Sequence, residues 1–116
     1  MSRRLNALSF KREVLHGSGI SIVRFCTDWN GTCQMMAPLF DELESYYNSF
    51  IRFFTIDADK NPQMLREFAI HEVPTILFFR DGHIIDHIRG SVAKNILEEK
   101  VRLLLPKSRS NNNFFL

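Results

Sequence analysis

The residues from Ile20 to Cys26 form a nearly continuous apolar run, rich in β-branched side chains and interrupted by the charged residue Arg24. A run of this kind is typical of a strand that is covered on both faces. The next segment, from Thr32 to about Tyr47, instead has apolar residues at steps of three and four, which predicts a helix with one buried stripe. A buried strand followed by such a helix indicates an α/β fold with helices packed on a central sheet.

The rest of the chain continues this alternation. Asp81-Gly82 separates the last two apolar runs and predicts a hairpin turn. Ser9, Asn61 and Ser91 are the expected helix N-caps. The expected helices are 10–16, 32–47, 62–69 and 92–105, and the expected strands after 20–26 are 51–56, 75–79 and 83–89, with 3–8 as a candidate edge strand. We therefore expect parallel pairing through crossovers, followed by an antiparallel hairpin.

The length and composition of the chain limit the number of domains it can form. A chain of 116 residues with 45% hydrophobic and 24% charged residues fits one folded domain. We assign residues 1–106 to that domain and residues 107–116, which include three consecutive asparagines, to a flexible C-terminal tail. The architecture that follows is a mixed sheet of four to five strands flanked by about four helices.

Charge and hydropathy narrow the function classes. The net charge is +2, with basic residues scattered among acids, so we expect no nucleic-acid partner. The N-terminus lacks the apolar stretch of a signal peptide and no segment is long enough to cross a bilayer, which predicts a cytoplasmic monomer without a membrane partner. His83 and His87 are too far apart on an extended strand to share an ion, so we expect no metal and no cofactor.

The candidate reactive segment is CTDWNGTC, residues 26–33, which joins the first buried strand to the helix that contains Pro38. Its Trp29 to Cys33 part, WNGTC, resembles the WCGPC segment of the thioredoxin family. The resemblance covers residues 5–105 and includes the DxDxNP segment of residues 57–62, Val73-Pro74-Thr75 and Gly90. It implies a thioredoxin fold in which Pro74 is cis and faces the redox motif.

The resemblance also implies how a partner is held. In the family, the backbone beside the cis-proline pairs with an extended substrate segment, and a tryptophan faces that segment. The implied partner is therefore an extended protein segment or a small thiol at the groove between Trp29 and Pro74. The substrate-binding residues that follow from this are Trp29, Gly31, Thr32, Val73, Pro74, Thr75 and Gly90.

Function departs from the family at Asn30, which replaces the attacking cysteine. Asparagine cannot attack a disulfide, but its side-chain oxygen can cap the following helix. Cys33 corresponds to the second, resolving cysteine, and Thr32 replaces the proline between them. The sequence therefore predicts a single-cysteine motif with weak or altered thiol-disulfide exchange through Cys33 in redox homeostasis. The alternative is a redox-inactive module that binds partners in the cis-proline groove, so enzyme activity stays open and an ordinary dithiol reductase is not expected.

Two further residues near the motif leave alternatives open. Arg24 stands where the family usually has an aspartate, and it either stabilises a Cys33 thiolate by its charge or reaches Asp57, Asp59 or solvent. Cys26 stands where the family has another tryptophan. It is either a small buried hydrophobe or a substitute partner for Cys33, if their Cα atoms come within bridging distance.

Overall fold

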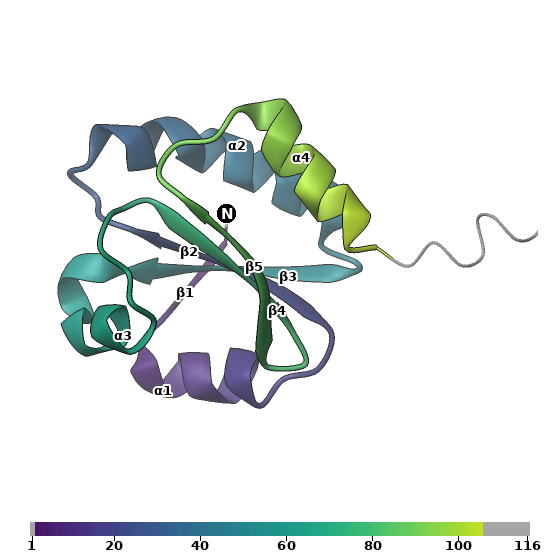
Figure 1. Ribbon diagram of the computed structural model, residues 1–116. Coiled ribbons are helices and arrows are strands. Elements are labelled where there is room, and N and C mark those ends of the chain that lie inside the picture. Colours follow the sequence, from purple (N-terminus) through teal and green to yellow (C-terminus); the bar gives the residue numbers. More distant parts are fainter. Residues whose placement is uncertain (1, 106–116) are drawn as a thin grey trace, which may run out of the picture.

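A five-stranded mixed sheet forms the centre of the computed structural model, which describes residues 2–105 (Figure 1). Its strands are β1 (Arg3–Leu5), β2 (Ile20–Cys26), β3 (Ile51–Asp57), β4 (Thr75–Arg80) and β5 (His83–Arg89). The strand order is β1-β3-β2-β4-β5, with β1, β3 and β2 parallel and β4 and β5 antiparallel to their neighbours. The predicted mixed sheet with a terminal hairpin is confirmed.

Helices cover both faces of this sheet. They are α1 (Ala7–Phe10), which continues as a π-helix over Lys11–Leu15, α2 (Gly31–Tyr47), α3 (Pro62–Glu67), which follows a 3-10 turn over Ala58–Lys60, and α4 (Lys94–Leu103). Figure 1 shows α2 and α4 on one face, and α1 and α3 on the other. Strand β2 lies at the centre of the sheet, and because helices cover the sheet on both sides, both faces of β2 are buried, as its apolar run predicts.

The two faces hold two separate apolar clusters, and β2 contributes to both. Val23 and Phe25 pack with Phe10 and Met64 on the side of α1 and α3, whereas Ile22 packs on the side of α2 and α4. Because side chains alternate along a strand, Arg24 and Cys26 point to the same side as Ile22, towards α2. This alternation places a charge and a sulfur beneath the first turns of α2.

Three predicted helix caps differ from the structure. The first helix is capped by Asn6, whose Oδ1 accepts a hydrogen bond from the backbone N–H of Ser9, and the Ser9 hydroxyl accepts one from the N–H of Asn6. Ser9 is therefore the third residue of a capping box and not the N-cap. Ala93 precedes α4 in place of Ser91, without a side-chain cap. Asn61 precedes Pro62 as expected, but its side chain donates to the Asp57 carbonyl and does not cap α3.

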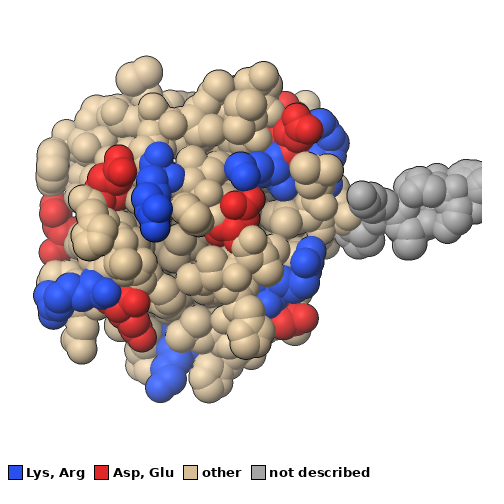
Figure 2. Space-filling view, viewed as in Figure 1, with Lys and Arg blue, Asp and Glu red and all other residues tan. Residues whose placement is uncertain are grey.

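The hairpin turn and the mixed surface charge agree with the sequence-based predictions better than the helix caps do. Asp81 and Gly82 have φ angles of 51° and 83°, the left-handed conformation that a tight turn between β4 and β5 requires. The face shown in Figure 2 mixes basic and acidic side chains without a patch of one sign. Within residues 2–105, no helix combines the length and apolar character needed to cross a bilayer. The tail assigned to residues 107–116 lies outside the described residues.

Candidate active site

Cys26 and Cys33 form a disulfide that joins the end of β2 to the first turn of α2. Their Cα atoms are 5.7 Å apart, within the range that a disulfide bridges. Of the two alternatives for Cys26, the structure therefore shows the substitute partner and not an isolated buried thiol. The prediction that Cys33 is a single thiol is wrong, because it treated the family position of the first cysteine as the only place from which a sulfur reaches Cys33.

The local fold explains how residues seven apart meet. Strand β2 ends at Cys26, and the backbone turns so that α2 begins at Gly31 with Asn30 as its N-cap. The Asn30 Oδ1 accepts a 2.9 Å hydrogen bond from the Cys33 N–H, and Gln34 Nε2 donates to the Asp28 carbonyl at 2.6 Å. These bonds fold the loop over the strand end and hold Cys33 above Cys26.

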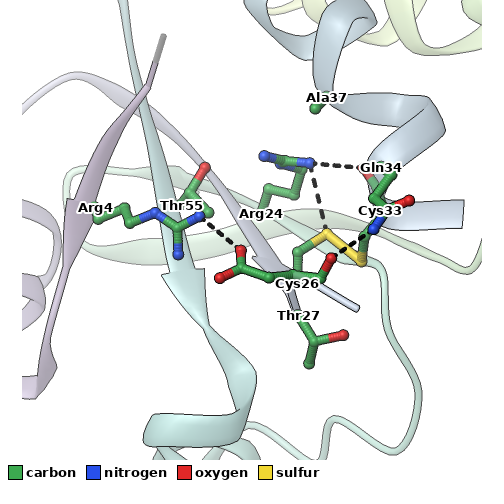
Figure 3. Close-up of a pocket in the computed structure, with 9 residues that line it drawn as sticks. Arg4, Arg24, Cys26, Thr27, Cys33, Gln34, Ala37 and Thr55 are labelled. Atoms are coloured by element: carbon green, nitrogen blue, oxygen red, sulfur yellow. Dashed lines mark hydrogen bonds and ion pairs between the residues drawn. A yellow bond between two sulfur atoms is a disulfide. The ribbon is translucent and has the colours of Figure 1, made fainter. Parts of the chain in front are cut away.

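Arg24 lies directly beside this disulfide. Its Nη1 donates to Cys26 Sγ at 3.6 Å and to the Cys33 backbone carbonyl at 3.2 Å, and its guanidinium stacks on the Phe40 ring at 5.2 Å from the centroid. Figure 3 shows the side chain reaching from β2 towards α2. Arg24 therefore contacts the cysteines, is largely buried, and among the described residues forms no ion pair with Asp57 or Asp59.

The charge of Arg24 is poorly compensated. Only 8% of the residue is exposed, its Nε has no hydrogen-bond partner, and none of the salt bridges within residues 2–105 involves it. Burial lowers the pKa of Arg24 below its ordinary value, and the negative charge of Asp41 opposes that shift. Arginine nevertheless stays protonated at neutral pH, so a positive charge lies in the protein interior next to sulfur.

A small cavity gives access to the sulfurs. It has a volume of about 110 Å³, and we call it the sulfur cavity. Its lining includes Arg4, Arg24, Cys26, Asp28, Cys33 and Thr55 (Figure 3). Arg4, which is on β1, forms an ion pair with Asp28 at 3.0 Å and a longer one with Asp57 at 3.9 Å. The lining therefore combines an exposed ion pair, Arg4 with Asp28, with the buried charge of Arg24.

A second hollow lies beside the first. It has a volume of about 210 Å³, and its lining includes Thr27, Trp29, Asp59, His71 and Val73. We call it the Trp29 groove. Trp29 is 69% exposed, and its Nε1 donates to Asp59 Oδ2 at 2.7 Å. Thr27 lines both hollows, so the Trp29 groove and the sulfur cavity adjoin at this residue.

The cis-proline loop borders the Trp29 groove through Val73. The Val73–Pro74 peptide bond is cis. The Pro74 carbonyl accepts a 2.8 Å hydrogen bond from the Gly90 N–H, and the Thr75 hydroxyl donates to the Glu72 carbonyl at 2.7 Å. Gly31 and Thr32 are the first two residues of α2. None of Gly31, Thr32, Pro74, Thr75 and Gly90 lines either hollow.

The structure thus places only some of the predicted site residues in the two neighbouring hollows. The sulfurs and Arg24 line one, and Trp29 and Val73 line the other. Sequence reasoning missed Arg4, Asp28 and Asp59. Arg4 could have been found from the candidate edge strand, since parallel pairing of β1 with β3 places Arg4 beside Thr55 at the strand ends. Asp28 and Asp59 lie in turns, where periodicity carries no information on side-chain direction.

Comparison with known proteins agrees with this architecture. The sequence model of the Thioredoxin family matches residues 2–103. "Thioredoxin 1" of Synechococcus elongatus is 35% identical over 89 residues, which cover 77% of this chain and 83% of that protein. "Thioredoxin" of Pyropia yezoensis is 36% identical over 89 residues, with the same coverage of both chains. "Thioredoxin M-type, chloroplastic" of Pisum sativum is 34% identical over 97 residues, which cover 84% of this chain and 56% of that protein.

These findings correct the function expected from the sequence. The cysteines are paired, and the relatives carry the name thioredoxin. The expectation of a single-cysteine motif with weak Cys33 chemistry, and its alternative of a redox-inactive binding module, are therefore wrong. The protein has two cysteines joined in a disulfide. The prediction was wrong because it considered only the motif at the helix start, where Asn30 occupies the usual position of one cysteine. The second sulfur comes instead from Cys26, at the end of the strand. By fold, by sequence match and by similarity along most of its length, the chain belongs to the thioredoxin family.

Proposed function

We propose that this protein is a thiol-disulfide oxidoreductase that cycles between the Cys26–Cys33 disulfide and the corresponding dithiol. The reduced form gives two electrons and two protons to a substrate disulfide, which becomes two thiols while the Cys26–Cys33 bond forms. An external dithiol then reduces that bond and is itself oxidised to a disulfide. The observation that carries the proposal is the disulfide between the end of β2 and the first turn of α2, beside a groove, in a thioredoxin-family fold.

The adjoining hollows support a protein or small-molecule partner. The Trp29 groove offers an exposed indole and the backbone of the cis-proline loop, which suit an extended segment bound by strand-like contacts. A disulfide in such a segment would lie across Thr27, one residue from Cys26. A small disulfide would enter the sulfur cavity directly. A cytoplasmic site of action is part of this proposal, although the relative from Pisum sativum is named chloroplastic.

The test is reduction of insulin disulfides by dithiothreitol, followed as the turbidity of the released chains. We expect the wild type to accelerate reduction, and Cys26→Ser and Cys33→Ser each to return the rate to that of dithiothreitol alone. Each variant keeps one sulfur, so a loss in both shows that the pair acts as a unit. Asn30→Cys serves as a reference, because it restores the spacing of the family motif on the same scaffold.

Two results would contradict the proposal. In one, Cys26→Ser keeps the wild-type rate, which would remove Cys26 from the reaction. In the other, the wild type is inactive while Asn30→Cys is active. The scaffold would then be competent, and the Cys26–Cys33 disulfide would be only a crosslink between β2 and α2.

A further inference from the structure

The two sulfurs of the redox pair lie in different electrostatic surroundings. The Arg24 guanidinium donates to the sulfur of Cys26, whereas its contact with Cys33 is with the backbone carbonyl. Cys33 lies at the start of α2, where free amides would ordinarily stabilise an anion. There, the Cys33 N–H already donates to the Asn30 side chain. Asn30 thus accepts from one of the helix-end donors, the N–H of Cys33 itself, and the guanidinium is directed at the other sulfur.

We propose that Cys26 is the attacking thiolate of this protein and that Arg24 is the positioning residue that holds it in the charged form. This inference rests on the proposed function and names the roles of the two cysteines within it. Its geometric basis is the 3.6 Å approach of Arg24 Nη1 to Cys26 Sγ at the wall of the sulfur cavity. It differs from the sequence-based expectation for Arg24, which concerned a Cys33 thiolate.

Burial of Arg24 favours this pairing in the reduced state. Arg24 is more than nine-tenths buried and has no ion pair to a carboxylate within the described range of the chain. A buried charge without an opposite charge is costly, and a thiolate 3.6 Å away supplies that charge. Reduction of the disulfide therefore creates a partner for Arg24, provided that Cys26 is the sulfur that ionises.

The guanidinium is held in place independently of the disulfide. Its bond to the Cys33 carbonyl and its stacking on Phe40 do not involve sulfur. Phe40 is itself fully buried in the cluster beneath α2. When the disulfide opens, these two contacts keep Arg24 beside Cys26.

Other charged groups modulate this effect and partly oppose it. Asp57 on β3 is the register partner of Cys26, and Asp28 lines the sulfur cavity, so both carboxylates disfavour a thiolate. Arg4 on β1 pairs with both of them, which offsets part of their negative charge. The negative charge of Asp41 on α2 raises the pKa of Arg24 and so favours its charged form. Arg24 is therefore the one cation on this wall that lacks a carboxylate within salt-bridge distance in residues 2–105.

The chemistry follows from these roles. The Cys26 thiolate attacks one sulfur of the substrate disulfide, which forms a mixed disulfide and expels one substrate thiolate. The Cys33 thiol then loses its proton to solvent and attacks Cys26 Sγ. The bond between Cys26 and the substrate breaks, the second substrate thiolate leaves, and each expelled thiolate takes a proton from water. Cys26 is also slightly more exposed than Cys33, at 6% against 2%, which favours the first contact with the substrate.

The test measures the thiolate absorbance near 240 nm against pH in two single-thiol variants, which requires no access of a reagent to buried sulfur. In Cys33→Ser, we expect Cys26 to titrate at least about one unit below the ordinary thiol pKa of about 8.5. In Cys26→Ser, we expect Cys33 to titrate at or above that value. Adding Arg24→Gln to Cys33→Ser should raise the Cys26 pKa by about one unit, so that the thiolate fraction at pH 6 falls roughly tenfold. Adding Arg24→Lys should recover most of that loss, because the charge remains.

The inference is overturned if Cys33 has the lower pKa of the two, or if Arg24→Gln leaves the Cys26 pKa unchanged. The two single-thiol proteins carry the intact Arg24, so the comparison between them stands even where an Arg24 variant does not fold. Insulin reduction by the wild type separates this failure from failure of the proposed function. If the wild type reduces insulin but Cys33 has the lower pKa, only the assignment of roles to the two cysteines is wrong. If the wild type is inactive, the proposed exchange reaction itself is wrong.

Discussion

At the scale of single residues, Asn30 stabilises the start of α2 at the position where the family has a reactive cysteine. Its Oδ1 caps α2 by accepting from the Cys33 N–H at 2.9 Å. The residue is partly exposed, and its side chain closes the loop that carries Trp29. The cap thus fixes the helix end from which Cys33 reaches down to the strand.

This role predicts a loss of stability in Asn30→Ala. Removing an N-cap acceptor costs about 1 kcal/mol of unfolding free energy. Urea unfolding of the oxidised protein measures it, with Asn30→Ser as the matched control that keeps a capping oxygen and should lose only a few tenths of a kcal/mol. Equal stability of Asn30→Ala and wild type would show that the cap contributes nothing.

Residue identity is also where prediction from sequence was weakest. The capping preference of Asn30 is a local property and could be inferred from its type. The pairing of Cys26 with Cys33 depends on the angle between a strand end and a helix start, which no spacing in the sequence specifies. The direction of Arg24 is equally non-local, because Phe40 and the Cys33 carbonyl that hold it come from α2.

At the scale of elements, the disulfide joins β2 to α2 and closes a loop with a sequence separation of seven residues. A loop of this size predicts that the oxidised protein is more stable than the reduced protein by roughly 2 to 3 kcal/mol, mainly because the crosslink restricts the unfolded chain. Parallel urea unfolding of the oxidised protein and of the protein kept in dithiothreitol measures the difference. Coincident unfolding curves would contradict the crosslink as the structure has it.

A second prediction at this scale concerns β5 and α4. Lys100 Nζ on α4 donates to Asp86 Oδ2 on β5 at 2.8 Å. Burial opposes ionisation of Asp86, but the hydrogen bonds from Lys100 and from the His87 N–H outweigh it, so the pKa of Asp86 lies below its ordinary value. A lowered folded-state pKa stabilises the protein above the unfolded value, near pH 4, and that contribution disappears as the pH falls through the folded-state pKa.

The comparison of wild type with Asp86→Asn isolates this ion pair. Because both side chains are partly exposed, we expect the wild type to be more stable by only a few tenths of a kcal/mol at pH 6. The difference should shrink below about pH 4. Thermal unfolding at several pH values measures it, and a difference that grows on acidification would have the wrong sign.

The elements themselves were largely predictable. The bounds of β2 and β5 follow from apolar runs and from the Asp81-Gly82 turn. The N-cap Asn6 was missed because Asn6 and Ser9 are both capping residues and the sequence does not rank them. The N-cap Ala93 was missed because alanine has no capping side chain that a sequence pattern could reveal.

At the scale of the whole molecule, the fold gathers the site at one end of the sheet. The carboxyl ends of β1, β2 and β3 supply Arg4, the cysteine Cys26 and Asp57, and the loop after β2 supplies Trp29. The sulfur cavity and the Trp29 groove meet at Thr27. This arrangement separates the Trp29 groove, where we propose that an extended segment binds, from the cavity that holds the sulfurs.

That separation predicts an effect of Trp29→Ala that depends on the substrate. The variant should raise the KM for insulin several-fold, because an exposed aromatic contact is lost. It should leave reduction of a small disulfide, such as oxidised 2-mercaptoethanol, close to the wild-type rate. Phe50→Ala is the matched control, since Phe50 is 65% exposed and lies in the turn just before β3, at the opposite end of the strands. An equal loss for both substrates would place Trp29 in the sulfur chemistry.

The central claim is that Cys26 and Cys33 exchange reversibly between disulfide and dithiol, and a redox titration tests it most directly. The protein is equilibrated in dithiothreitol buffers of graded potential, the free thiols are trapped with acid and an alkylating agent, and mass spectrometry counts them. We predict a single two-electron transition between about −120 and −300 mV, the range of redox-active thioredoxin-fold proteins, with no singly alkylated form. A pair that stays oxidised well below −300 mV, or two thiols that alkylate independently at every potential, would contradict the account.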